Sequence, residues 1–176
     1  SETQKRTEEL ALVNRIVTQL GASLDIQEAM KLVAQGLVEG VGVHQSRIAL
    51  LDDNREKLTI VGECFDEVKN QSALGLQIPV IGNDLTQHVM ATREPVVVED
   101  ALTDPLTKPV HDMLRGQGVF KLAVLPMLVG NDVIGTVGLD MLTENEQITA
   151  EMLRLAETII FQAAATIQHT RLFAQT

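Results

Sequence analysis

The sequence contains very few aromatic residues. It has no Trp and no Tyr, and its four Phe residues bring the aromatic content to only 2%. Stacking platforms for nucleobases are therefore scarce, and the hydrophobic core must be built from Leu, Val, Ile, Met and Ala. Hydrophobic residues still make up 45% of the 176 residues. That proportion is typical of a folded domain and not of a disordered segment.

Basic residues are outnumbered by acidic ones, and long apolar runs are absent. The chain has 14 Lys and Arg against 24 Asp and Glu, a net charge of −10. Proteins bind phosphate backbones through clustered Lys and Arg, so this balance argues against nucleic acid and anionic membrane surfaces as partners. No run of about 18 apolar residues is present, so no segment is expected to cross a membrane. Residues 1–6 lack the apolar stretch of a signal peptide.

Cysteine is nearly absent, and the histidines are scattered. Cys64 is the only cysteine, which excludes an internal disulfide and a Cys-rich zinc site. A reducing cytoplasm is the simplest compartment for such a chain. His44, His88, His111 and His169 include no pair at the spacing that puts two metal ligands on one helix face. We therefore predict no metal site.

Two helices are predicted before the first strand. Residues 4–20 carry apolar side chains at heptad spacing, which predicts a helix with a seam for a partner helix. The apolar residues are Leu10, Val13, Ile16, Val17 and Leu20. A second helix is predicted to begin after Asp25, whose carboxylate can cap the free backbone N–H groups, and to end at Gly40 and Gly42.

The longer strand patterns form two hairpins. Residues 47–51 and 58–63 flank a short polar turn. Residues 119–129 and 133–141 flank Gly130-Asn131-Asp132, which is typical hairpin chemistry. The sequence therefore predicts two antiparallel strand pairs.

The stretch between the hairpins, residues 64–118, has poor periodicity and contains four prolines. Short helices are predicted at 84–91 and 110–116, and a short strand at 96–98. A long irregular stretch inside a compact domain is usually functional or mobile, and ligands often bind to such segments.

A long final helix completes the pattern. Thr143 and Glu146 form a possible capping box at its start, and the helix is predicted to run to about Ala174. Its apolar residues exceed one stripe, which predicts one buried face on the sheet and another on a partner helix. Helices at both ends of a sheet of hairpins indicate an α+β fold. No repeat or linker divides the chain, so residues 1–176 are predicted to form a single domain.

Four segments in this order resemble the GAF domain family. Residues 9–25 fit its start, and residues 82–100, with their short helix and Glu94-Pro95 turn, resemble its middle motif. Residues 118–139 resemble its last hairpin, and residues 142–173 its closing helix. The resemblance covers nearly the whole chain.

The resemblance implies a central antiparallel sheet of five or six strands. The terminal helices would cover one face, and the irregular middle, where the family holds small ligands, would cover the other. It also implies a non-catalytic sensory module of a bacterial signalling protein such as a sensor histidine kinase, phosphodiesterase or diguanylate cyclase. GAF domains often dimerise through terminal helices and precede an output domain. Residues 1–20 and 160–176 are therefore expected to extend toward a partner subunit or neighbouring domains.

The last strand carries the best-defined candidate ligand site. Thr136, Gly138 and Asp140 alternate with Val137 and Leu139, so the two sets lie on opposite faces. The apolar pair should pack under the terminal helices. The small and polar set should then face the irregular segment and form the floor of a ligand pocket.

Five other residues are candidates for the same ligand site. His111 and Arg115 on the second short helix could reach this space, and Arg115 would suit a carboxylate or phosphate. His88 and His111 are conceivable single haem ligands. Phe120 stands where the bilin-binding branch of the family often has a basic residue. Cys64 could attach a bilin or sense redox if its thiol were activated.

The sequence does not fully match the motifs of the family's known ligand-binding and catalytic branches. The bilin-binding branch carries its Cys beside the short helix, where this sequence has Pro109 and Val110, so a bilin photosensor is disfavoured. Residues 140–146 lack the Asn-Lys pair of the cyclic-nucleotide-binding branch. The thiol-dependent methionine sulfoxide reductases of the family need more than one Cys. We therefore assign no cofactor.

A ligand-free structural dimerisation module is the main alternative to a sensor. The heptad seam of the first helix fits both. A collapsed cavity filled by Met90, Met113 and Phe120 would indicate a structural module. An open cavity lined by polar groups would indicate a sensor.

Overall fold

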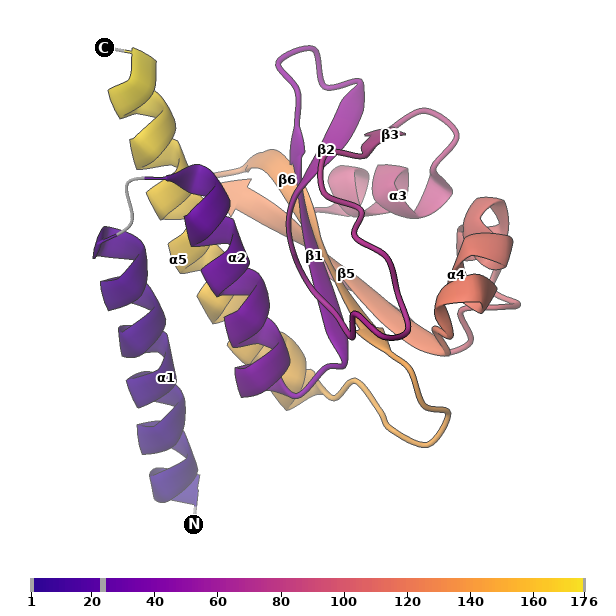
Figure 1. Ribbon diagram of the computed structural model, residues 1–176, viewed down its shortest axis with the longest axis horizontal. Helices are drawn as coiled ribbons and strands as arrows, with labels where there is room; N and C mark the ends of the chain where they lie inside the picture. The colour runs from indigo at the N-terminus through magenta and orange to yellow at the C-terminus, as the bar shows by residue number, and fades with distance from the viewer. Residues whose placement is uncertain (1, 23–24, 176) are drawn as a thin grey trace.

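A six-stranded antiparallel sheet forms the centre of the computed structural model, which describes residues 2–22 and 25–175, with side chains for 2–17 and 25–169. The strand order is β3-β2-β1-β6-β5-β4, and helices lie on both faces (Figure 1). The strands are β1 (Gln45–Leu51), β2 (Lys57–Cys64), β3 (Gln77–Pro79), β4 (Val96–Val98), β5 (Lys121–Val129) and β6 (Asp132–Met141). The helices are α1 (Glu2–Ala22), α2 (Ile26–Gly36), α3 (Asp84–Thr92), α4 (His111–Gln117) and α5 (Ala150–Gln175). The predicted α+β fold is confirmed.

Both predicted hairpins are present in the sheet. β1 pairs with β2, and β5 pairs with β6 across a two-residue turn in which Gly130 has a φ of 61°. β3 was not predicted, because its three residues are too few to show alternation. It pairs with Lys57–Thr59 of β2 and extends the sheet by one short edge strand.

The terminal helices lie on one side of the sheet in two layers. α2 and α5 cover the sheet, and α1 packs outside them (Figure 1). A π-helical turn, η1 (Leu37–Val41), extends α2, and Gly42 ends it in the left-handed conformation. α1 approaches this segment closely at two glycines. A Cβ atom on Gly36 would lie 2.7 Å from Cδ1 of Ile16, and one on Gly40 would lie 2.2 Å from Cδ2 of Leu12.

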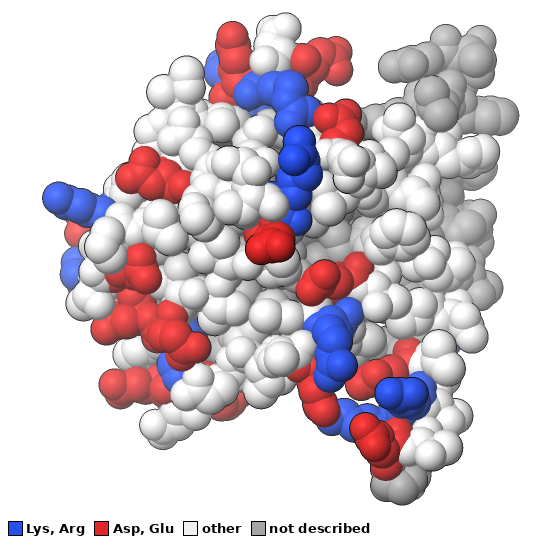
Figure 2. Space-filling model, turned by 180° about the vertical axis from the view of Figure 1, so that it is seen from behind, with Lys and Arg blue, Asp and Glu red and all other residues white. Residues whose placement is uncertain are grey.

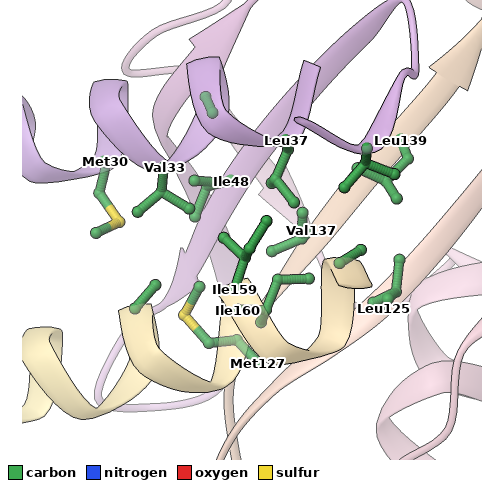
Figure 3. Packing of buried hydrophobic residues seen from close by; sticks show 14 of the residues in the cluster. Met30, Val33, Leu37, Ile48, Leu125, Met127, Val137, Leu139, Ile159 and Ile160 are labelled. Carbon is green, nitrogen blue, oxygen red and sulfur yellow. The ribbon is translucent and has the colours of Figure 1, made fainter. Parts of the chain in front are cut away.

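The main hydrophobic core lies between the sheet and the α2–α5 layer. Figure 3 shows its side chains converging from both helices and the strands. The labelled residues are Met30, Val33, Leu37, Ile48, Leu125, Met127, Val137, Leu139, Ile159 and Ile160. All are aliphatic or Met, as the aromatic-poor composition requires.

The opposite face of the sheet carries two smaller apolar clusters. One lies over β4 and β5 under α3 and α4, and includes Leu85, Val98, Leu114 and Leu122. The other lies over β1 and β2 and includes Leu58, Ile60 and Val80. The irregular segment and the short helices cover this face, as predicted.

The start of α5 differs from the prediction. The helix begins at Ala150, and the hydroxyl of Thr149 accepts a hydrogen bond from the backbone N–H of Met152 (3.2 Å). The proposed capping box at Thr143 and Glu146 was wrong. Glu146 instead lies 2.9 Å from Nε2 of His44, and Ile148 is buried in the main core. Tertiary contacts therefore hold this segment out of the helix.

The surplus apolar surface of α5 is mostly buried within the chain. Ala156, Ile160 and Ala164 belong to the main core, and Leu153 packs against it. α1 covers another flank of α5. Phe161, by contrast, is 64% exposed.

Replacing Thr149 tests the observed start of α5. Thr149→Ala should lower the free energy of unfolding by about 1 kcal/mol, because it removes the side chain that caps the N–H of Met152. Thr143→Ala, on the exposed stretch before the helix, should change it by less than about 0.5 kcal/mol. Urea denaturation of both variants measures the difference, and equal losses would contradict the assigned cap.

Candidate functional site

The predicted alternation along β6 is confirmed. Val137 and Leu139 are fully buried in the main core beside α5. Thr136, Gly138 and Asp140 therefore lie on the opposite face, which the irregular segment and the short helices cover. The strand register places Gln45 of β1 beside Asp140 and Arg47 beside Gly138.

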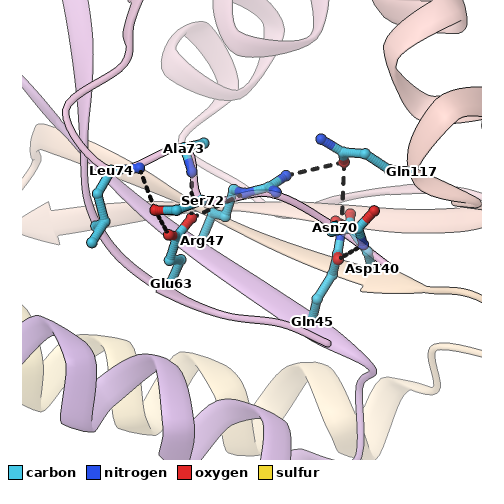
Figure 4. A network of polar contacts seen from close by, with 9 residues as sticks. All are labelled: Gln45, Arg47, Glu63, Asn70, Ser72, Ala73, Leu74, Gln117 and Asp140. Carbon is cyan, nitrogen blue, oxygen red and sulfur yellow. Dashed lines mark hydrogen bonds and ion pairs between the residues drawn. The ribbon is translucent and has the colours of Figure 1, made fainter. Parts of the chain in front are cut away.

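A network of polar side chains crosses this face of the sheet (Figure 4). Gln45, fully buried, donates from Nε2 to Oδ2 of Asp140 at 2.5 Å. Its Oε1 accepts from Nδ2 of Asn70 at 2.8 Å. Asn70 belongs to the segment between β2 and β3, so this bond ties that segment to the floor of the sheet.

Arg47 is the central cation of the network. Its Nη1 donates to Oε1 of Gln117, the last residue of α4, at 3.0 Å. Nε lies 3.7 Å from Oε2 of Glu63, the residue beside it on β2. That distance is too long for a hydrogen bond. Nε and Nη2 are buried and have no hydrogen-bond partner. Two buried donors without acceptors cost free energy in the folded state.

Glu63 fastens the segment after β2 to the sheet. Its Oε2 accepts from the backbone N–H of Ala73 at 2.9 Å, and its Oε1 accepts from the hydroxyl of Ser72. The network therefore joins three parts of the chain: the segment after β2, the face of the sheet and the end of α4. A ligand that changed these bonds would change how all three are held.

Gly138 leaves open space beside Arg47. A Cβ atom built on Gly138 would meet no heavy atom within 4 Å. Gly135 on the same strand is different, because a Cβ there would lie 2.2 Å from the carbonyl oxygen of Ala49. Gly135 is needed for close backbone packing, whereas the space over Gly138 is free to hold a ligand atom.

The surroundings of Asp140 disfavour its charged form. Burial raises the pKa of its carboxyl group above the usual value of 3.8, and the hydrogen bond from Gln45 and the charge of Arg47 oppose that rise. The folded state therefore favours the protonated acid relative to the unfolded chain. The carboxylate form would gain from a further cationic or hydrogen-bond-donating group.

The raised pKa of Asp140 predicts a pH effect on stability. The folded state binds this proton more tightly than the unfolded state does. The resulting stabilisation of the folded state is present below pH 3.8 and is lost as the pH rises through the pKa of Asp140 in the folded state. In Asp140→Asn this loss should be missing, and the variant should gain stability relative to wild type with rising pH over that window. Urea denaturation at a series of pH values measures it. Parallel stability curves would contradict the assignment.

Two predicted site residues on α4 point elsewhere. Nε2 of His111 lies 3.0 Å from the carbonyl oxygen of Asp104 and 3.1 Å from the hydroxyl of Thr107, and so belongs to the turn η2 (Pro105–Val110). Arg115 pairs with Asp112 at 3.1 Å on the exposed side of the helix. Their hydrogen bonds and ion pairs to described residues do not reach the network, and Gln117 supplies that link from α4.

The structure does not bring Cys64, His88 or Phe120 to the network. Cys64 is the last residue of β2 rather than a loop residue, and it packs against the main core on the α2 side. Burial, and then the charge of Glu39, raise the pKa of its thiol, which disfavours the reactive thiolate. His88 is exposed on α3, and Phe120 is 38% exposed before β5.

Sequence reasoning missed most of the network. Its missed members are Gln45, Arg47, Glu63, Asn70 and Gln117. The alternation that selected Asp140 also selects Gln45 and Arg47, which lie two residues apart on the first strand. Asn70 and Gln117 lack such a signal, because folding alone brings them to the sheet.

One surface hollow, of about 620 Å³, lies between α2 and β2 and is lined in part by Glu63 and Ser72 of the network. Another, of about 420 Å³, lies between α1 and α5. Thr136, Gly138 and Asp140 line neither. Met113 and Phe120 are exposed, and Met90 packs against the β1–β2 cluster. These three residues therefore do not form the collapsed cavity expected of a structural module.

The surface charge is mixed. Figure 2 shows acidic and basic side chains interspersed over the face opposite the view of Figure 1, with no broad basic area among the described residues there. Within the described part of the chain, no helix is long and apolar enough to cross a membrane. No group of three or more His, Cys, Asp and Glu residues is placed there to hold a metal ion.

Comparison with known proteins identifies the fold. A model of the GAF domain matches residues 23–168. The chain belongs to the GAF domain family. The matched range runs from the start of α2 into α5, so α1 lies outside it. A search of curated proteins found no match.

Solved structures of other proteins share this architecture. The GAF domain of a phosphoenolpyruvate-protein phosphotransferase from Coxiella burnetii is 19% identical, with a TM-score of 0.81 over 97% of this chain and 98% of its own. Residues 122 to 287 of a methyl-accepting chemotaxis protein are 21% identical, with a TM-score of 0.76 over 90% and 98%. A phycoerythrobilin-bound GAF domain from a cyanobacterial phytochrome is 16% identical, with a TM-score of 0.78 over 94% and 97%. At these identities the likeness concerns the fold.

Proposed function

We propose that this GAF domain is a non-catalytic regulatory module that binds a small molecule over Gly138 and relays its binding state through α5. The observation that carries the proposal is the open space over Gly138, on the face of the sheet that carries the polar network of Gln45, Arg47 and Asp140.

The two faces of β6 support the proposed relay. Gly138 and Asp140 face the network, whereas Val137 and Leu139 pack into the core that Ile159 and Ile160 of α5 share. The site and α5 are therefore separated by the thickness of one strand. A ligand transmits a signal only if it binds two states of the domain with different affinities. Two parts of the chain differ between these states: residues 65–76 and α4. Both are bound to the network.

Native mass spectrometry of the freshly purified protein tests ligand binding. We expect a fraction of the wild-type chain to carry a noncovalent adduct, and Gly138→Leu to lack it, because the added side chain fills the open space. Circular dichroism checks that the variant folds. A bare wild-type mass, with no change in melting temperature after incubation with a small-molecule extract of cells, would favour the structural module.

We also propose that the domain dimerises through its terminal helices. Leu10 of α1 is 64% exposed, and Val17 of the same predicted seam and Phe161 of α5 are exposed as well. Leu20, the last residue of that seam, lies outside the described side chains. Ile16 faces inward, so the seam divides into an inner side and an outer side that is free for a second chain.

Sedimentation velocity tests the dimer. The wild type should sediment as a dimer at micromolar concentration, and the double variant Leu10→Ala with Phe161→Ala should sediment as a monomer. Val68→Ala with Ile81→Ala, two exposed apolar residues outside the terminal helices, is the matched control and should remain dimeric. A monomeric wild type would contradict this part of the proposal.

The likeness to domains of signalling proteins supports a place for this domain within a larger signalling protein. We propose that α5 continues into an output domain of a cytoplasmic bacterial signalling protein, such as a sensor histidine kinase, phosphodiesterase or diguanylate cyclase. The family match ends at residue 168, within α5, and this supports a helix that continues toward a following domain.

A further inference from the structure

The hollow between α2 and β2 runs along the outer edge of β2. It has a volume of about 620 Å³, and residues 59–63 of the strand all line it. Successive side chains of a strand point to opposite faces of the sheet, so a hollow that contacts all of these residues lies along the edge. Beyond Ile60 this edge has no strand partner among the described residues. β3 pairs only with Lys57–Thr59, and Gly75 and Leu76 bond to the backbone of Ile60.

Two walls flank this open edge. One wall is α2, which packs directly on β2: a Cβ atom on Gly62 would lie 2.7 Å from the carbonyl oxygen of Met30. The other wall is the segment after β2, which lies on the opposite face of the sheet, where Asn70 donates to Gln45. An extended chain in the hollow would therefore direct alternate side chains toward each wall.

The charge of the hollow favours a basic occupant. Asp25, Glu28 and Glu67 line it, and Lys31 is the one Lys or Arg among the described residues that do so. Glu28 and Glu67 are exposed. Lys or Arg side chains of an incoming chain would be attracted to these carboxylates, and Asp or Glu side chains would be repelled.

The segment after β2 adds an apolar contact surface. Phe65 and Leu74 line the hollow, and Leu74 is 58% exposed. The acidic residues Asp25 and Glu28 lie on the opposite wall, at the start of α2. A strand in which basic and apolar residues alternate would match both walls at once.

We propose that this hollow binds an extended, basic segment of a partner protein as an added strand on β2, with Lys or Arg side chains toward α2 and apolar side chains toward Phe65 and Leu74. Backbone hydrogen bonds to the open edge would supply affinity, and the two walls would supply specificity. The site is separate from the space over Gly138. Glu63 connects the two, because it lines the hollow and also holds Ala73 in the polar network.

Fluorescence anisotropy with labelled peptides tests the proposal. The probes are peptides of about eight residues, long enough to span the edge, in which Lys or Arg alternates with Val or Leu. We expect at least one to bind the full chain. Its analogue with every backbone amide N-methylated should bind about 100-fold more weakly, because it cannot donate backbone hydrogen bonds to β2. Binding by none of the probes, or equal binding by the N-methylated analogue, would overturn the proposal.

Paired variants test the charge of the site. Glu28→Gln with Glu67→Gln should weaken binding of the best peptide about tenfold, because two carboxylates of the hollow are lost. Glu94→Gln with Glu144→Gln removes two exposed carboxylates that do not line the hollow and should bind as the wild type does. Circular dichroism checks that both variants fold. Equal effects of the two pairs would overturn the proposal, since the peptide would then respond only to net charge.

Amide NMR spectra locate the contact. The peptide should shift the backbone amide signals of residues 59–64 and 72–75 more than those of α3 and α4. Spermine carries several positive charges but no peptide backbone, so we expect it to bind more weakly than the peptide. Spermine binding as tightly as the peptide, or peptide-induced shifts confined to other parts of the chain, would overturn the proposal.

Discussion

Gly135→Ala is expected to destabilise the domain by about 3 kcal/mol. The added Cβ would lie 2.2 Å from the carbonyl oxygen of Ala49 and 3.1 Å from Cδ2 of Leu50. A backbone oxygen cannot move aside as a flexible side chain can, so the β1–β6 pair must shift. Urea denaturation followed by circular dichroism measures the loss.

Gly138→Ala is the matched control on the same strand. Its Cβ would meet no heavy atom within 4 Å, and its backbone does not require glycine. We therefore expect its stability to stay within about 0.5 kcal/mol of wild type. An equal loss for both glycines would mean that the space over Gly138 is not open, and would remove the basis of the ligand site.

Ile159→Ala is expected to cost about 4 kcal/mol of unfolding free energy. Ile159 is fully buried between α5 and the sheet (Figure 3), and truncation leaves a cavity in a close-packed aliphatic core. Thermal and urea unfolding should both show the loss. The same change tests whether α5 is an integral part of the domain.

Phe161→Ala is the comparison two residues further along α5. Its side chain is mostly exposed, so truncation should change the stability of the monomer by less than about 0.5 kcal/mol. The two variants should therefore separate folding from dimerisation. A large loss for Phe161→Ala at concentrations where the protein is monomeric would show that this ring packs within the chain.

The fold was predictable where the sequence pattern is local. The turn at Gly130 and the alternation along 133–141 indicated β5 and β6, because hairpin chemistry and period-two burial depend on neighbouring residues. The start of α5 was not predictable in this way. Thr143 and Glu146 match a helix cap, but His44, about a hundred residues away in sequence, takes the carboxylate of Glu146.

The candidate site was predictable only on one strand. The alternation of Thr136, Gly138 and Asp140 indicated a floor for the ligand. The partners of that floor come from β1, the segment after β2 and the end of α4, and only the strand register places Arg47 beside Gly138. Cys64 was a candidate because a thiol can be reactive, but the pleat of β2 turns its side chain toward the main core.

Hydrogen–deuterium exchange on wild type and Arg47→Gln tests most directly whether the polar network communicates with α5. Removing the guanidinium breaks the link between β1 and α4, so we expect faster exchange in α4, in residues 65–76 and in α5. Arg115→Gln should leave all three unchanged. Faster exchange in α4 and residues 65–76, with α5 as in wild type, would contradict the relay from the ligand site to the output helix.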